Sequence, residues 1–290
     1  MNITERLRMK FSLINVDRSS LERSASLLQQ VFPKAKKFSG DYLQWLYHDN
    51  PYGKVVGFEA WDRDVLAAHY ATIPTIMKDE ARSYRCLLSL NTAVSESHRG
   101  QGLFLKLASQ TYQRAKEEGF DFVFGIANAH STPGFIKLGF ELVTPLKVRW
   151  GIGRFWKGPP VHKLVQTQYT NSYLDWRFRS YQGPYHLLQE GESMGKRLIV
   201  RELDHNMPAV VMGGVSEGFM DRFELPEVQR RHLLYIGYEP DLSFLKLKSL
   251  TIPKRLKPSP LNLIYKPLNP ELPMDLGKRL KIQAADFDAY

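Results

Sequence analysis

A strand, a glycine-containing loop, a helix and a second strand follow one another between residues 86 and 128, and this succession constrains the fold most strongly. Residues 86–94 have the composition of a strand. Apolar residues recur at helical spacing after the loop and predict a helix over residues 102–118 that ends at Gly119. Residues 120–128, FDFVFGIAN, form a nearly continuous apolar run, which is typical of a buried central strand.

Two glycines, Gly100 and Gly102, stand at the start of this helix in the stretch HRGQGLF. The first turn of a helix has unpaired N–H groups and a positive dipole end. Without a Cβ in the way, those N–H groups can approach a large anion. The stretch can therefore be a phosphate cradle, to which Arg99 and Lys106 add charge, or a turn before an ordinary surface helix. The glycine spacing alone does not decide between them.

The flanking segments complete a mixed α/β pattern. Helices are expected at 19–32, with Ser19 or Ser20 as the cap, at 41–53 and at 132–138, and strands at 55–60, 65–74 and 140–150. Helices, an antiparallel meander and a strand–helix–strand–helix–strand run predict a mixed, mostly antiparallel sheet flanked by helices.

The length of 290 residues favours two domains, and proline and glycine concentrate at 151–160. We therefore expect one domain at 1–157 and a second at 158–290. The motif YLQW at 42–45 returns as YLDW at 173–176, and a Pro-Tyr pair follows each copy. This echo predicts that the second lobe is a degenerate copy of the first.

Composition restricts the class of protein. The net charge of +10 favours anionic partners. The single cysteine, Cys86, excludes a disulfide framework and a thiolate metal cluster, and no residue spacing suggests a metal site. The first residues lack the apolar core of a signal peptide, and no apolar run is long enough to span a bilayer, so we expect a cytoplasmic protein. No nucleic-acid-binding motif is present.

Taken together, HRGQGLF and the later segment NAHSTPGFIKLGF resemble the GNAT family of acetyl-CoA-dependent N-acyltransferases, over roughly residues 10–150. The resemblance implies a GNAT-type sheet, with a degenerate GNAT-like lobe after it. It implies acetyl-CoA as co-substrate and no metal. The residues that it implies for CoA are Ala93 and Val94 for the pantetheine, Arg99, Gly100, Gln101, Gly102 and Leu103 for the pyrophosphate, and Asn128, Ser131 and Phe135 near the pantetheine arm.

Two positions depart from the family pattern. Ser97 stands where glutamine or arginine usually opens the loop. Phe135 replaces a tyrosine that in many members protonates the leaving thiolate, and it has no proton to give. Phe135 and Phe104 can instead line a slot for a longer acyl chain. The substitution also leaves open a rival function, an inactive module that binds CoA or a partner.

The residues around the reacting amine are less clearly marked. His69 and Glu59 are candidate general bases, and each can equally be a core residue. Candidate substrate contacts are Asn91, Trp176, Arg177 and Tyr185, of which Trp176 also fits a core position. The two-lobed layout looks like acyltransferases of polysaccharide pathways. The expected acceptor is therefore a small primary amine, in particular a nucleotide-linked amino sugar.

Between residues 242 and 267 there are six basic residues and no acidic one: Lys246, Lys248, Lys254, Arg255, Lys257 and Lys266. This run is either a solvated basic edge that protects a sheet from pairing or a surface for a nucleotide diphosphate or an anionic membrane. The sequence leaves both interpretations open.

Overall fold

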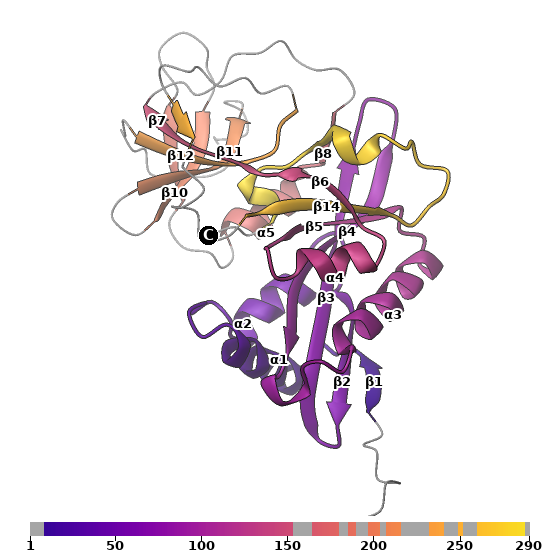
Figure 1. The fold of residues 1–290 in the computed structure, drawn as a ribbon. Helices are drawn as coiled ribbons and strands as arrows, with labels where there is room; N and C mark the ends of the chain where they lie inside the picture. Colours follow the sequence, from indigo (N-terminus) through magenta and orange to yellow (C-terminus); the bar gives the residue numbers. More distant parts are fainter. Residues whose placement is uncertain are drawn as a thin grey trace, which may run out of the picture.

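The structure is a computed structural model, and it describes residues 9–152, 164–179, 185–189, 197–203, 207–215, 232–240, 249–251 and 260–287 (Figure 1). Its helices are α1 (Arg18–Val31), α2 (Gly40–Leu43), η1 (Gln44–His48), η2 (Glu96–His98), α3 (Leu103–Glu117), α4 (Thr132–Lys137), α5 (Asn171–Arg179), η5 (Leu276–Arg279) and η6 (Ala284–Asp286). Its strands are β1 (Lys10–Leu13), β2 (Val56–Asp62), β3 (Val65–Lys78), β4 (Ser83–Val94), β5 (Phe122–Ala127), β6 (Glu141–Pro145), β7 (Lys147–Ile152), β8 (Val165–Thr167), β9 (Tyr185–Gln189), β10 (Arg197–Leu203), β11 (Met207–Val215), β12 (His232–Gly237), β13 (Ser249–Thr251), β14 (Asn262–Pro267) and β15 (Leu280–Lys281).

The main sheet has the strand order β1-β2-β3-β4-β5-β14-β6, and β8 extends it beside the end of β3. All neighbours along this path are antiparallel except β4 and β5, which are parallel. Helix α3 packs its apolar side on one face of the sheet, and α1 and α2 pack on the other (Figure 1). The expected mixed, mostly antiparallel sheet with flanking helices is confirmed.

A second sheet has the order β13-β7-β12-β11-β10-β9 and forms the second lobe (Figure 1). The two sheets exchange strands. The predicted single strand at 140–150 is wrong, because the chain passes from β6 in the main sheet to β7 in the second sheet at Leu146. In return, β14 lies between β5 and β6 in the main sheet. Membership of the sheets therefore does not follow the predicted ranges 1–157 and 158–290, whose boundary lies outside the described residues.

Local capping differs from the prediction at α1. Asp17, rather than Ser19 or Ser20, caps this helix, because its carboxylate accepts from the backbone N–H of Ser20 at 3.0 Å. Hydrogen bonds from Ser20 and Ser19 lower the pKa of Asp17 to about 2. The aromatic segment at 41–53 begins at a serine cap, Ser39, and continues from α2 into one turn of π-helix, η1.

The two copies of the aromatic motif pack against each other. The rings of Trp45 and Trp176 are stacked, with centroids 4.8 Å apart. Each indole Nε1 donates to the backbone carbonyl of the other tryptophan at 2.9 Å. Because both contacts are reciprocal, the sequence echo corresponds to a local two-fold arrangement that joins η1 to α5.

Candidate functional site

The glycine loop before α3 has the geometry of an anion-binding helix start. Gly100 and Gly102 adopt left-handed φ angles of 78° and 71°. A Cβ built on either glycine would meet nothing within 4 Å, so the loop faces open space. No side chain caps α3, and its first turn has no acidic residue. Its N–H groups and dipole are therefore available to an external anion.

His98 anchors this loop to the main sheet. Its Nδ1 lies 2.7 Å from the Ser95 hydroxyl, and its Nε2 lies 3.2 Å from Asp62 Oδ2. Ser97, the departure noted above, is exposed and lies 3.0 Å from the same Nδ1. Of the two predicted charges, Arg99 is exposed at the loop, whereas the ammonium of Lys106 lies 3.8 Å from the centre of the Phe11 ring.

Strands β4 and β5 separate beside the loop. Their parallel pairing extends from Cys86 and Phe122 to Ser89 and Gly125 and stops there. Beyond this point Ala93 and Val94 pair only with β3 among the described residues, opposite His69 and Ala68. The edge of β4 that faces β5 is thus left for an extended ligand, which could add to it as a strand does.

Asn128 and Ser131 form a tight turn at the end of β5. Asn128 Oδ1 accepts from the N–H of His130 at 3.0 Å and of Ser131 at 2.9 Å. The Ser131 hydroxyl in turn bonds to the N–H of Asn128 at 3.1 Å. Both residues thus shape the start of α4 on the far side of the gap from β4.

Phe135 is buried on the α3 side of the sheet. Its ring contacts Phe104 and Phe140, each with centroids 5.1 Å apart. The pair Phe104 and Phe135 is therefore an apolar cluster under α4, and Phe135 supplies no hydroxyl to a leaving group.

A β-bulge in β4 lies next to the gap. Ala93 faces His69 and Leu90 faces Ala71, so Asn91 and Thr92 lie opposite one residue of β3. Asn91 has a left-handed φ of 47°. Bulges often redirect a side chain at a functional site, and here the redirected side chain is that of Asn91.

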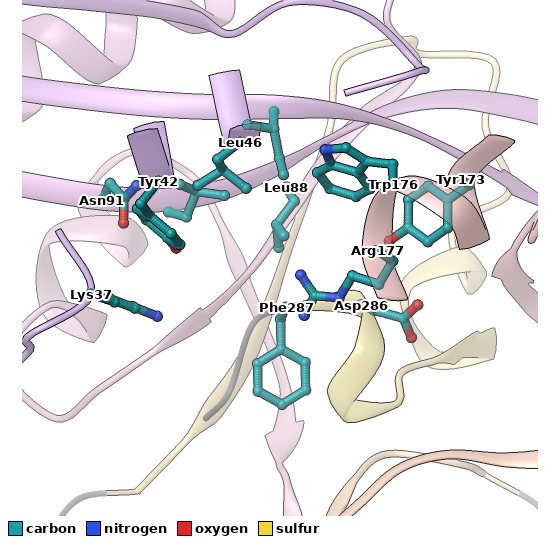
Figure 2. Close-up of a pocket in the computed structure, with 12 residues that line it drawn as sticks. Lys37, Tyr42, Leu46, Leu88, Asn91, Tyr173, Trp176, Arg177, Asp286 and Phe287 are labelled. Atoms are coloured by element: carbon teal, nitrogen blue, oxygen red, sulfur yellow. The ribbon is translucent and has the colours of Figure 1, made fainter. Parts of the chain in front are cut away.

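Asn91 lines a cavity of about 50 Å³ (Figure 2). The cavity lies on the α1 and α2 side of the sheet, because its lining residues Tyr42, Leu46 and Leu88 belong to the core cluster of that side. Leu88 and Leu90 of β4 form its floor, and α5 and the segment after η6 form other walls. A water-sized group needs about 10–15 Å³ by the same kind of measure. The cavity can therefore hold a small head group, and the rest of a ligand would remain outside it.

The cavity wall carries both signs of charge. Figure 2 shows Lys37 on the side of Asn91 and the guanidinium of Arg177 reaching between Leu88 and Phe287. Asp286 lies beside Arg177, and its carboxylate accepts from the Tyr169 hydroxyl at 2.7 Å. Burial raises the pKa of Asp286, although Arg177 and the hydrogen bonds oppose this.

The two candidate general bases are buried in the core, outside the lining of the cavity. His69 and Glu59 are 0% and 3% exposed, and neither lines the cavity. His69 Nδ1 is 3.0 Å from Glu59 Oε1, and His69 Nε2 is 2.9 Å from the Tyr47 hydroxyl. Direct removal of a proton from a ligand by either residue is not supported, because both are sealed inside the core.

The predicted acceptor contacts separate into two groups. Asn91, Trp176 and Arg177 line the same cavity, and Trp176 is also the buried core residue that its pattern suggested. Tyr185 does not line it. This tyrosine begins β9 in the second sheet, and its ring packs edge-on against Phe178 at 5.0 Å.

The described residues contain only one member of the predicted basic run, Lys266, which lies on β14. Burial, and to a lesser extent Lys116, lowers its pKa. Lys246, Lys248, Lys254, Arg255 and Lys257 lie outside the described residues, so both interpretations of the run stay open.

Sequence reasoning missed four contributors to the site: Tyr47, His98, Lys37 and Asp286. His98 could have been found, since it directly precedes the loop. Asp286 gives no such indication, because it lies far along the sequence from the β4 residues that line the cavity with it.

Comparisons with known proteins agree with this geometry. Residues 13–143 match the family described as acetyltransferase (GNAT) domain. No curated protein matches the chain in sequence. Among solved structures, the chain is similar to a GCN5-related N-acetyltransferase from Anabaena variabilis, with 10% identity, a TM-score of 0.60, and coverage of 90% of this chain and 73% of that chain.

Two further structures show the same fold. One is a protein from Enterococcus faecalis described as a probable N-acyltransferase, with 10% identity, a TM-score of 0.58, and coverage of 90% of this chain and 73% of that chain. The other is Eis1 from Mycobacterium abscessus, with 9% identity, a TM-score of 0.57, and coverage of 89% and 74%. Residues 13–143 thus match the model of an acetyltransferase (GNAT) domain, and the fold of the chain is a GNAT-like main sheet with a second sheet lobe.

None of the helices in the described ranges combines the length and the apolar character needed to cross a bilayer.

Proposed function

We propose that this chain, through its GNAT domain, is an acyl-CoA-dependent N-acyltransferase that moves an acetyl group from acetyl-CoA to a primary amine. The observation that carries the proposal is the loop at Gly100 and Gly102. Its two left-handed glycines face open space in front of an uncapped helix, next to the separated ends of β4 and β5. A dinucleotide-like diphosphate with an extended arm fits these features.

Different residues of the site would bind different parts of the two substrates. The N–H groups from Gly100 to Leu103 would hold the pyrophosphate of CoA, since that of Arg99 already donates to the Glu96 carbonyl at 3.3 Å. Ala93 and Val94 would pair with its pantetheine. Acetyl-CoA, when bound, supplies an activated thioester. A backbone N–H at the end of β4 would stabilise the oxyanion, as preorganised donors do in acyl transfer. The cavity at Asn91 would hold the amine on the opposite side.

The transfer forms one bond and breaks one. The amine nitrogen bonds to the carbonyl carbon, the carbon–sulfur bond breaks, and the thiolate takes the electron pair. The nitrogen loses a proton to solvent, and the thiolate can later take one from solvent. Phe135 gives no proton, but a thiol with a pKa near 8.5 is a fair leaving group without assistance.

For the acceptor, we propose an amino sugar that carries phosphate, in particular a nucleotide-linked amino sugar used in surface polysaccharide synthesis. The lining holds two cations, Lys37 and Arg177, and one carboxylate, Asp286, so an anionic acceptor is favoured over a cationic one. The cavity is large enough for the amine-bearing end of such a molecule, and the phosphate would remain outside it.

The test is a CoA-release assay at pH 8 across glucosamine, glucosamine 6-phosphate, nucleotide-linked amino sugars, aminoglycosides and peptides, each with acetyl-CoA. Turnover with phosphate-bearing amino sugars, and less with the unphosphorylated sugar, is expected. Turnover with peptides alone would refute the sugar assignment.

A second function is an inactive module that binds CoA. It is motivated by Phe135, which has no hydroxyl to protonate a leaving thiolate. Acetyl-CoA that stabilises the protein without turnover of any amine in the panel would favour that module. No stabilisation by acetyl-CoA would refute both functions.

A further inference from the structure

A continuous chain of hydrogen bonds links the buried core to the wall of the cavity. The Ser24 hydroxyl donates to Glu59 Oε1 at 2.8 Å, and the same oxygen lies 3.0 Å from His69 Nδ1. His69 Nε2 lies 2.9 Å from the Tyr47 hydroxyl, to which Asn91 Nδ2 donates at 3.0 Å. The chain crosses from β2 through β3 and η1 to the bulge of β4.

The hydrogen-bond chain has a single direction when Glu59 is ionised and His69 is neutral. A carboxylate only accepts, so the proton between it and His69 belongs to Nδ1. A neutral imidazole then has an acceptor at Nε2, and the Tyr47 hydroxyl must give its only proton to that nitrogen. The Tyr47 oxygen is left to accept, which requires the NH₂ group of Asn91 on its side.

The direction of these hydrogen bonds determines which atom of the Asn91 amide is available to a ligand. With its nitrogen held by Tyr47, the amide oxygen is the atom turned away from the core. Figure 2 shows this oxygen on the side of Lys37, and Asn91 lines the cavity. The left-handed backbone at Asn91 gives the side chain its place at the bulge.

We propose that Glu59, His69 and Tyr47 are positioning residues that fix the amide of Asn91 so that its Oδ1 accepts a hydrogen bond from the acceptor amine. This inference rests on the proposed function and names a residue that selects the acceptor. A cavity that presents an oxygen acceptor favours ligands with N–H donors, such as an amine or ammonium. It disfavours a carboxylate or carbonyl at the same place, since two acceptors would face each other.

The experiment reads the direction of the chain from the two ring nitrogens of His69, by ¹⁵N NMR of the histidine-labelled full-length protein at neutral pH. In the wild type, Nδ1 is expected to carry the proton and Nε2 to show the shift of an unprotonated acceptor. A proton on Nε2 instead would mean that the chain runs toward the cavity and that Asn91 presents its NH₂ group, which overturns the proposal.

A pair of variants tests whether the protonation of the His69 ring nitrogens depends on the side chain at position 91. In Asn91→Asp the new carboxylate cannot donate, so Tyr47 is expected to turn its proton toward it and to accept from Nε2–H. His69 should then be protonated on both nitrogens. Asn91→Gly tolerates the left-handed backbone and removes the amide, so it should keep the wild-type pattern. Unchanged nitrogen shifts in folded Asn91→Asp would overturn the coupling.

The ligand arm uses glucosamine 6-phosphate as the probe, titrated into the protein with saturating CoA. Asn91→Gly should weaken its binding on the order of tenfold or more, the range for a lost hydrogen bond to a charged group. Equal binding by both proteins would overturn the role of Oδ1. The nitrogen shifts need no substrate, so an absence of acetyl transfer with the expected shifts would count against the proposed function alone.

Discussion

Replacing Gly102 by alanine separates the binding role of the loop from its structural role. Gly102 has a φ of 71°, and an added Cβ meets no protein atom within 4 Å. The substitution should therefore lower the free energy of unfolding only by the cost of a left-handed backbone at alanine, about 1–2 kcal/mol. The same methyl group points into the open space where the N–H groups of the loop would meet a pyrophosphate.

Gly119, at the other end of the same helix, is the matched control. Its φ is 74°, and an added Cβ would have only an ordinary contact, 3.7 Å from Arg85 Nη1. Gly119→Ala should thus cost the same 1–2 kcal/mol, roughly, and leave the loop unchanged.

Thermal unfolding with and without acetyl-CoA is the assay. At a hundredfold excess over its dissociation constant, a ligand that binds only the folded state stabilises it by about 2.7 kcal/mol. For 290 residues, an unfolding entropy of about 2.1 cal/mol/K per residue makes the increase in Tm roughly 4–5 °C. We expect wild type and Gly119→Ala to show this increase and Gly102→Ala to lose it. A folded Gly102→Ala protein with the full increase would refute the assignment of the cradle.

Two further predictions concern stability. Trp176→Ala should lower the free energy of unfolding by roughly 3–5 kcal/mol in urea, because it removes a buried ring stacked on Trp45; a loss below 1 kcal/mol, roughly, would mean that the two motifs do not hold each other. At Asp79, burial acts to raise the pKa, but hydrogen bonds from the N–H groups of Arg82 and Ala81 outweigh it and hold the pKa at about 2. A lowered pKa stabilises the folded state above the unfolded pKa, so Asp79→Asn should cost about 1–2 kcal/mol at pH 7 and progressively less as the pH falls from about 4 to 2. A difference from wild type that does not change with pH would contradict this reasoning.

Local chemistry made the geometry of the loop before α3 predictable. The start of α3, the left-handed Gly102 and the turn at Asn128 depend on residues within a few positions of one another. Their roles follow from backbone freedom and from side-chain-to-backbone hydrogen bonds. The two aromatic motifs could be noticed in the sequence, but not that Trp45 and Trp176 stack, because no local preference specifies a contact between such distant segments.

The residues around the cavity were harder to predict from the sequence for the same reason. His69 and Glu59 were singled out as candidate bases or core residues, and the structure places both in the core. Their connection to the cavity depends on Tyr47, which belongs to another element and gives no periodic indication of its partner. Asp286 reaches the cavity from a part of the chain that shows no motif. The prediction of one strand at 140–150 was wrong because the alternation of side chains does not record a change of sheet at Leu146.

The place of β14 between β5 and β6 has a consequence for how the chain is made. A ribosome releases residues 13–143, which match the acetyltransferase family model, long before residues 262–267 emerge. Until then β5 and β6 have exposed edges, which are prone to pair with other chains. The nascent protein must therefore wait for its C-terminal segment, or be shielded meanwhile. A gene fragment cut after the family match at residue 143 would encode a sheet without β14 and without the end of β6.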